Sequence, residues 1–139
     1  MINKVKTTWK GNMQLESTNP GGNLMIDADA EVGGEGKGYR PKSLMLSSLA
    51  GCTGLDVQSL LVKMRAQVEA FDIEVEANLT DEHPKYYDKV HVTYNFYGKD
   101  LKKDKIEKAV NLSVDRYCGV IEMFRKFSKL TTEIKYHER

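Results

Sequence analysis

The feature that most constrains the fold is a long apolar segment from Pro41 to about Arg65, which contains no proline after its first residue. Proline suits the first turn of a helix because its missing N–H would have no intrahelical partner there. Apolar side chains lie on nearly every side of the first half, which is typical of a buried helix. They are Leu44, Met45, Leu46, Leu49, Leu55, Val57, Leu60, Leu61 and Met64.

This predicted helix is long for the size of the chain. The 139 residues are expected to form one domain, residues 1–139. A helix of about 25 residues spans roughly 37 Å, whereas the radius of gyration expected for such a chain is about 14 Å. We therefore expect the helix either to bend, at Gly51 or Gly54, or to complete its burial against another subunit.

The remaining pattern predicts an α+β protein. Apolar and polar residues alternate from Phe71 to Leu79 and from Val90 to Phe96, which indicates two half-buried antiparallel strands. The segregated order of strands, helix, strands, helix and strand favours α+β over a parallel doubly wound sheet. The other expected elements are strands Val5–Trp9, Met13–Glu16, Asn23–Ile26 and Leu130–Tyr136, helices Ile106–Tyr117 and Val120–Phe127, and a flexible connector Val32–Tyr39.

Composition excludes several classes of protein. Lys and Arg total 21 and Asp and Glu total 20, so a net charge of +1 argues against binding to nucleic acid or to membrane surfaces. No segment approaches the roughly 20 apolar residues of a membrane span, and residues Met1 to Lys10 contain no apolar signal sequence. We therefore expect a cytoplasmic protein. The spacing of the two cysteines and three histidines predicts no metal site and no cofactor.

The two cysteines are the best candidates for chemistry. Cys52 lies inside the long helix among small residues, and it shares a polar stripe with Ser48, Asp56 and Ser59. Cys118 follows the later helix. If it also opens the next helix, exposed N–H groups there favour its thiolate. The residues by themselves leave two alternatives open, a redox pair and two buried cysteines that only fill space.

Two motifs resemble those of the OsmC/Ohr family. In that family a proline opens the central helix and a cysteine follows eleven residues later, which is the spacing of Pro41 and Cys52. The run from Arg40 to Val57 resembles the whole central-helix motif. A second cysteine closes the later helix in the family, and the run from Asp115 to Val120, which contains Cys118, resembles that motif.

The resemblance implies a fold and an activity. It implies an OsmC-like α+β fold, in which antiparallel sheets wrap around two central helices of an intertwined homodimer. It also implies a thiol-dependent peroxidase for organic hydroperoxides, in which Cys52 attacks the peroxide and Cys118 then forms a disulfide with it. A dithiol of the lipoyl type is the implied reductant.

The sequence departs from the family at two charged positions. Active members have an arginine near the N-terminus that holds the thiolate and a glutamate early in the central helix that orients the arginine. Here the glutamate position falls on Lys42 or Ser43, and no arginine precedes Arg40. Arg40, Lys42 and Arg116 are the candidates to support the thiolate instead, while an unpaired Asp56 would oppose it. The alternative function is therefore a small-molecule-binding or redox-sensing dimer without turnover, and inert cysteines in a structural dimer remain a third.

Overall fold

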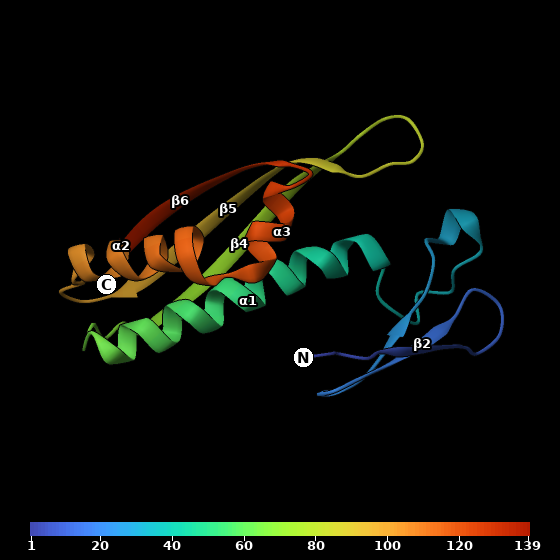
Figure 1. Cartoon of the computed structure of the whole chain (residues 1–139), viewed down its shortest axis with the longest axis horizontal. Coiled ribbons are helices and arrows are strands. Elements are labelled where there is room, and N and C mark those ends of the chain that lie inside the picture. The colour runs from blue at the N-terminus through green and yellow to red at the C-terminus, as the bar shows by residue number, and fades with distance from the viewer. The chain divides into compact units, whose positions relative to one another are not determined.

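The computed structural model describes residues 1–139 as an α+β chain with two three-stranded sheets, which confirms the predicted fold class (Figure 1). The chain divides into two compact units, residues 1–45 and residues 46–139, and each is described by itself. The expectation of a single domain stays a prediction.

The first unit contains an antiparallel sheet of strands β1 (Lys6–Trp9), β2 (Leu15–Asn19) and β3 (Gly22–Ile26). Strand β2 begins two residues later than the predicted Met13–Glu16, because residues 10–14 form the turn that joins it to β1. In this turn the N–H of Gln14 donates to the carbonyl of Gly11, and Gly11 has a φ of 105° that suits glycine.

The segment after β3 is anchored by a buried carboxylate. Asp27 is 1% exposed, and its two oxygens accept hydrogen bonds from the backbone N–H groups of Ala28, Glu35 and Lys37 at 2.8, 3.0 and 3.1 Å. The glycine-rich stretch was expected to be a flexible connector. That expectation missed these contacts, because an aspartate binding backbone groups eight and ten residues away leaves no periodic signal in the sequence.

Helix α1 runs without interruption from Pro41 to Lys63, as predicted. Its buried residues follow a four-residue spacing along one face, and they are Leu49, Thr53, Val57 and Leu61. Much of the rest of its apolar surface is open, since Leu55 is 76% and Val62 is 67% exposed. By length and composition this helix could cross a membrane, contrary to the expectation that no segment could, but a single helix of this kind is weak evidence of a span.

The second unit contains a sheet of strands β4 (Ala70–Leu79), β5 (Tyr87–Gly98) and β6 (Lys129–Glu138). β4 and β5 are antiparallel, as predicted. The expectation of antiparallel sheets is wrong for β6, which pairs with β5 in parallel. The helices between the two strands carry the chain back to the end of the sheet where β5 began, so both strands run in the same direction.

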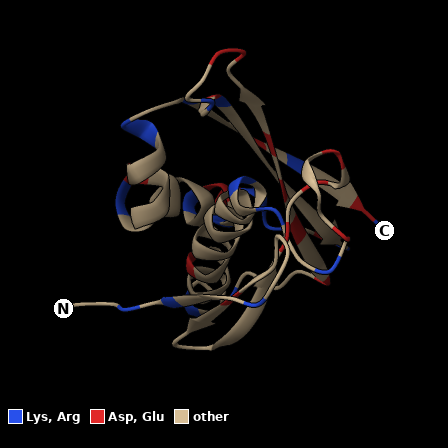
Figure 2. Ribbon diagram, turned by 90° about the vertical axis from the view of Figure 1, so that its right-hand side faces the viewer, with Lys and Arg blue, Asp and Glu red and all other residues tan.

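Three helical segments make this crossover, namely α2 (Lys103–Leu112), a π-helical turn of residues Ser113–Tyr117, and α3 (Gly119–Arg125). They lie on the same face of the sheet as α1 (Figure 1). The core between sheet and helices contains the inward side chains of β5, including Val90, Val92, Tyr94 and Phe96. Acidic residues lie along β4, and charged residues of both signs lie along β6 (Figure 2).

Candidate thiol site

The structure brings Cys52 and Cys118 together. Cys52 lies on α1 and is half-buried, whereas Cys118 lies between the π-helical turn and α3 and is 4% exposed. Both thiols are free. The Cys52 thiol is close enough to Cys118 to raise the pKa of the Cys118 thiol. Two residues that are distant in sequence therefore share one site.

The π-helical turn sets the position of Cys118. The N–H of Cys118 donates to the carbonyl of Ser113, five residues earlier, at 2.8 Å. Such wide turns inside helices often occur at functional sites. The turn ends at Cys118, whose extended backbone precedes the first turn of α3, and its Sγ accepts a hydrogen bond from the N–H of Ile121 at 3.4 Å.

The electrostatics of Cys118 combine two opposing effects. Cys118 does open α3, as the sequence suggested, and the N–H groups of Ile121 and Val120 lower its pKa. Burial has the larger effect, however, and together with the neighbouring Cys52 thiol it raises the pKa of Cys118 to about 12. The N–H groups at the helix terminus therefore favour the Cys118 thiolate as expected, but desolvation penalises the charged form more strongly and decides the net direction.

Four polar side chains form a continuous chain of hydrogen bonds beside the thiols. The Thr53 hydroxyl lies 2.8 Å from the Tyr94 hydroxyl and 2.7 Å from that of Ser113. The Ser113 hydroxyl in turn donates to a carboxylate oxygen of Asp56 at 3.1 Å. Tyr94, Thr53 and Ser113 are all fully buried. The buried hydroxyl groups of this chain are therefore all hydrogen-bonded. One of them belongs to Thr53, the residue that directly follows Cys52.

Tyr94 connects this chain electrostatically to Cys118. Burial raises the pKa of Tyr94 to about 12, and charge on Cys118 or Asp56 acts in the same direction. The hydrogen bond with Thr53 and the positive charge of Arg125 act in the opposite direction. The Tyr94 hydroxyl therefore belongs to the same buried centre as the resolving thiol candidate.

Asp56 is at the outer end of the chain. It is half-buried and lines a surface hollow of about 390 Å³. The other residues around this hollow are Ser59, Leu60, Lys63 and Tyr117. Asp56 was expected to oppose the Cys52 thiolate only if its carboxylate were unpaired. In the structure the carboxylate accepts a hydrogen bond from Ser113.

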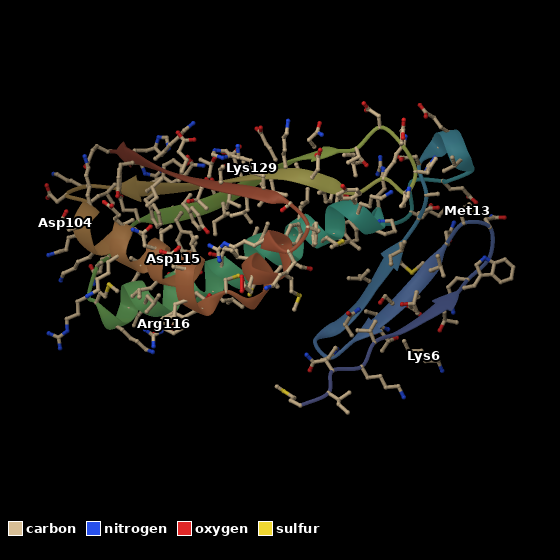
Figure 3. The ribbon with its side chains drawn as sticks, turned by 45° about the horizontal axis from the view of Figure 1, so that its top comes forward. Lys6, Met13, Asp104, Asp115, Arg116 and Lys129 are labelled. Atoms are coloured by element: carbon tan, nitrogen blue, oxygen red, sulfur yellow. The ribbon has the colours of Figure 1, made fainter.

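The three cationic residues that were predicted to support the Cys52 thiolate lie in different surroundings. Arg40 hydrogen-bonds through Nε to the carboxylate of Asp29 within the first unit, and Lys42 is exposed. Arg116 is exposed beside Asp115 on the π-helical turn, with its guanidinium 6.0 Å from the Tyr117 ring centre (Figure 3).

Arg125 is a cation that the sequence analysis did not single out. Its Nη2 donates to the carbonyl of Val114 at 2.7 Å, and its guanidinium lies 3.7 Å from Asp115 and 3.9 Å from Glu122. It is the arginine whose charge reaches Tyr94. No local motif marks it, because its relation to Tyr94 arises from the packing of α3.

Thr53, Tyr94 and Ser113 were also missed, although the sequence carried a signal for two of them. Thr53 is the polar member of the buried stripe that includes Leu49, Val57 and Leu61. Tyr94 lies on the apolar face of β5, and a buried tyrosine hydroxyl usually requires a partner. The combination of the two predicts a buried hydroxyl pair, whereas nothing in the sequence marks Ser113 as their third member.

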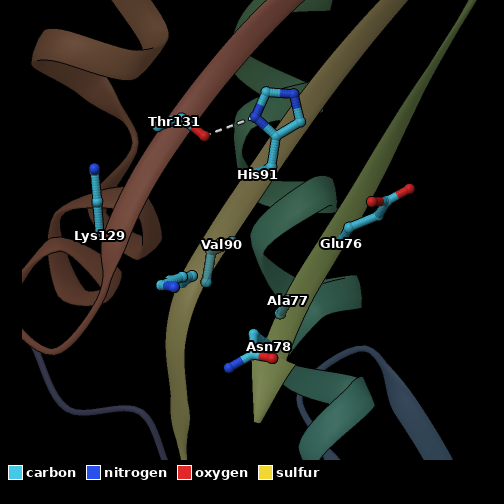
Figure 4. A pocket seen from close by; sticks show the side chains of 8 residues that line it. Glu76, Ala77, Asn78, Val90, His91, Lys129 and Thr131 are labelled. Carbon is cyan, nitrogen blue, oxygen red and sulfur yellow. Dashed lines mark hydrogen bonds between the residues drawn. The ribbon is translucent and has the colours of Figure 1, made fainter. Parts of the chain in front are cut away.

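A second hollow lies on the β4–β5–β6 sheet, away from the cysteines. It has a volume of about 460 Å³, and His91 Nδ1 lies within it 2.6 Å from the Thr131 hydroxyl (Figure 4). Its lining residues are Glu76, Ala77, Asn78, Lys89, Val90, His91, Lys129 and Thr131. The chain contains no group of three or more His, Cys, Asp or Glu side chains that could hold a metal ion.

Comparisons with known proteins agree on one family. The family model described as OsmC-like protein matches residues 34–133, which include both cysteines. Protein YhfA of Escherichia coli strain K12 is 30% identical over 95 residues, covering 68% of this chain and 71% of YhfA.

Solved structures share the fold over the whole chain. A hypothetical protein from Aquifex aeolicus has a TM-score of 0.87 at 26% identity, covering 100% of this chain and 98% of the other. An organic hydroperoxide resistance protein from Legionella pneumophila has a TM-score of 0.71 at 18% identity, covering 97% of each chain, a likeness that concerns the fold alone. Because the family model spans both cysteine motifs and the central helix, this chain belongs to the OsmC-like protein family.

Proposed function

We propose that this protein is a thiol-dependent peroxidase that reduces organic hydroperoxides through Cys52 and Cys118. The observation that carries the proposal is the interaction between the two thiols, one half-buried and one buried. The structural likeness to an organic hydroperoxide resistance protein supports it. The difference in burial assigns the roles, since a peroxide reaches the more accessible Cys52 first.

The reaction consists of three steps. The Cys52 thiolate attacks one peroxide oxygen, the O–O bond breaks, and an alcohol leaves while Cys52 becomes a sulfenic acid. Cys118 then condenses with the sulfenic acid to form a disulfide and water. An external dithiol of the lipoyl type reduces the disulfide by thiol–disulfide exchange.

The direct test is a steady-state assay with cumene hydroperoxide as oxidant and dihydrolipoamide as reductant. We expect turnover by the wild type and none above background for Cys52→Ser. Cys118→Ser should still consume one equivalent of peroxide but should accumulate the sulfenic acid. Wild-type turnover no higher than that of Cys52→Ser would contradict the proposal.

The working form that we propose is a cytoplasmic homodimer. Helix α1 leaves Leu55 and Val62 largely exposed in the single chain, and a second subunit would remove this apolar area from water. A reducing compartment such as the cytoplasm suits two free cysteines, because it keeps the pair available for oxidation.

A second candidate is a redox-sensing or small-molecule-binding dimer without turnover. It is favoured by the surroundings of the arginines, since Arg40 is paired with Asp29 and Arg125 is bound to the Val114 carbonyl. The rate at which cumene hydroperoxide oxidises Cys52 distinguishes the two functions. A rate far above that of free glutathione with repeated turnover supports the peroxidase, a fast rate without turnover supports the sensor, and a rate similar to that of glutathione supports the binder.

A further inference from the structure

The side chain of Ser113 fastens the π-helical turn before Cys118 to helix α1. Its hydroxyl lies 2.7 Å from the Thr53 hydroxyl and donates to a carboxylate oxygen of Asp56 at 3.1 Å. The Thr53 carbonyl is a second acceptor for the same hydroxyl, at 3.5 Å. Ser113 and Thr53 are fully buried, so water does not compete for these contacts. We call this set of three contacts the Ser113 clasp.

The clasp joins the backbone that carries one thiol to the backbone that carries the other. On α1, Thr53 directly follows Cys52. On the other side, the Ser113 carbonyl accepts the N–H of Cys118 at 2.8 Å, which closes the π-helical turn. Two hydrogen bonds through Ser113 therefore connect the residue next to Cys52 with Cys118 itself. Cys118 belongs to the buried core, and Cys52 packs against the same core.

The π-helical turn has a second anchor that does not involve α1. Arg125 of α3 donates from Nη2 to the carbonyl of Val114 in the turn at 2.7 Å. The Sγ of Cys118 accepts the N–H of Ile121 in the first turn of α3 at 3.4 Å. Loss of the clasp would therefore release the turn from α1 while these contacts still hold it to α3. The effect of the clasp can thus be separated from the presence of the turn.

We propose that Ser113, bound to Thr53 and Asp56, is a positioning residue that holds the Cys118 thiol in place for its attack on the sulfenic acid of Cys52. This inference rests on the proposed peroxidase function and adds to it the residue that controls the rate of the second step. Ser113 acts through the backbone of Cys118.

The position of Cys118 matters because the attack has strict geometric requirements. The Cα atoms of a disulfide usually lie about 4.4–6.8 Å apart, and the attacking sulfur must approach nearly in line with the S–O bond that breaks. A misplacement of about 1 Å can slow such a reaction about 100-fold. A contact that fixes the turn of Cys118 on the helix of Cys52 therefore has a direct effect on this rate.

The step balances without a further reactant. The Cys118 sulfur forms a bond to the Cys52 sulfur, the S–O bond of the sulfenic acid breaks, and the departing hydroxide leaves as water with the Cys118 proton. The thiol sulfur is oxidised and the sulfenic sulfur is reduced. If this step is slow, a second hydroperoxide transfers an oxygen atom to the sulfenic acid and leaves as an alcohol. Cys52 then becomes a sulfinic acid, which dithiols do not reduce.

The main test compares one substitution at two serines. Ser113→Ala removes the clasp and keeps the backbone bond to Cys118. Ser128→Ala is the matched control, because the half-buried Ser128 donates to the Phe124 carbonyl at 2.6 Å and takes no part in the clasp.

Rapid mixing with one equivalent of cumene hydroperoxide separates two rates. Loss of peroxide reports the oxidation of Cys52, and decay of the trapped sulfenic acid reports disulfide formation. We expect Ser113→Ala to oxidise Cys52 at the wild-type rate but to form the disulfide at least about tenfold more slowly. Ser128→Ala should match the wild type in both rates. Partial unfolding would slow both steps together, so the split between them is specific to positioning.

Over-oxidation gives a second readout of the same competition. With increasing amounts of cumene hydroperoxide, mass spectrometry measures the fraction of Cys52 that has gained two oxygen atoms. Disulfide formation and over-oxidation compete for one sulfenic acid. We therefore expect Ser113→Ala to reach a given sulfinic fraction at about one tenth of the peroxide concentration that the wild type requires.

Two substitutions at Thr53 keep the proposal testable if Ser113→Ala fails to fold. Thr53→Val keeps the side-chain shape and removes the hydroxyl contact with Ser113, whereas Thr53→Ser keeps the hydroxyl and removes a methyl group. We expect disulfide formation to be about fivefold slower in Thr53→Val and within twofold of the wild type in Thr53→Ser. Rescue by serine would exclude packing as the cause, because serine fills the buried site less well than valine.

The outcomes distinguish the two proposals. A wild type that forms no Cys52–Cys118 disulfide with the peroxide overturns the proposed function and the role of Ser113 with it. A wild type that forms the disulfide, with Ser113→Ala forming it equally fast, overturns the role of Ser113 alone. Equal slowing of both steps in Ser113→Ala, or Thr53→Ser slower than Thr53→Val, would also overturn that role, because stability or packing would then control the rate.

Discussion

The hydroxyl oxygens of Thr53 and Ser113 lie 2.7 Å apart in the interior of the protein. Thr53 follows Cys52 directly in helix α1, and the Ser113 carbonyl binds the N–H of Cys118. This one contact therefore joins the helix that carries the first thiol to the turn that ends at the second. Both its stability and its chemistry can be tested.

Ser113→Ala should destabilise the folded protein by about 1–3 kcal/mol, because the buried Thr53 hydroxyl loses a hydrogen-bond partner. Urea unfolding followed by circular dichroism measures the change. Ser59→Ala, an exposed serine on α1 that shares the hollow with Asp56, is the control and should change stability by less than about 0.5 kcal/mol. Equal losses for the two variants would show that the buried contact is not stabilising.

Cys118 should make the folded protein less stable at high pH. The unfolded chain loses the Cys118 proton above about pH 8.5, whereas the folded chain keeps it until the pKa of about 12. The unfolded state then binds fewer protons, so the free energy of unfolding falls as pH rises between these values and is unaffected below them.

Unfolding by urea at pH 7, 9 and 10 measures this fall in the reduced protein. Cys118→Ala should be less stable than the wild type at pH 7 but should lose less stability on going to pH 10. The comparison removes the contribution of the buried tyrosines, which both proteins share. Parallel curves for the two proteins would contradict the raised pKa.

Asp27→Ala should release the segment from Ala28 to Lys37. The N–H groups of Lys37, Glu35 and Ala28 lower the pKa of Asp27 against the effect of burial. The stabilisation is therefore present above about pH 4, the unfolded value, and is lost as pH falls further. Amide hydrogen exchange of Glu35 and Lys37 should quicken in Asp27→Ala, while Asp29→Ala should leave both amides protected. Unchanged exchange in Asp27→Ala would show that the carboxylate does not hold the loop.

Leu55→Asp should weaken the proposed dimer. Leu55 is 76% exposed on α1, so the substitution costs the single chain little, whereas a charge buried at an interface is strongly unfavourable. Sedimentation velocity at micromolar concentration should show dimer for the wild type and monomer for the variant. Tyr86→Asp, in the loop between β4 and β5, should remain dimeric. A monomeric wild type would exclude the dimer.

Much of the fold was predictable because it is encoded in local patterns. The alternation in β4 and β5, and the start of α1 at Pro41, depend on the spacing of residues within one element. The direction of β6 was not predictable from alternation, because a strand buried on one face has the same pattern in parallel and antiparallel pairs. That direction is decided by the path of α2 and α3 between β5 and β6.

The candidate site, like the fold, was predictable from the sequence only in part. The sequence by itself determined the pair of cysteines and their family, because motif spacing is a property of the chain. Only the tertiary structure decided that burial outweighs the helix terminus at Cys118, and that Tyr94, Thr53 and Ser113 join Asp56 in one chain. The physical reason is that hydrogen bonding and desolvation depend on which distant residues pack together, and no local pattern records those neighbours.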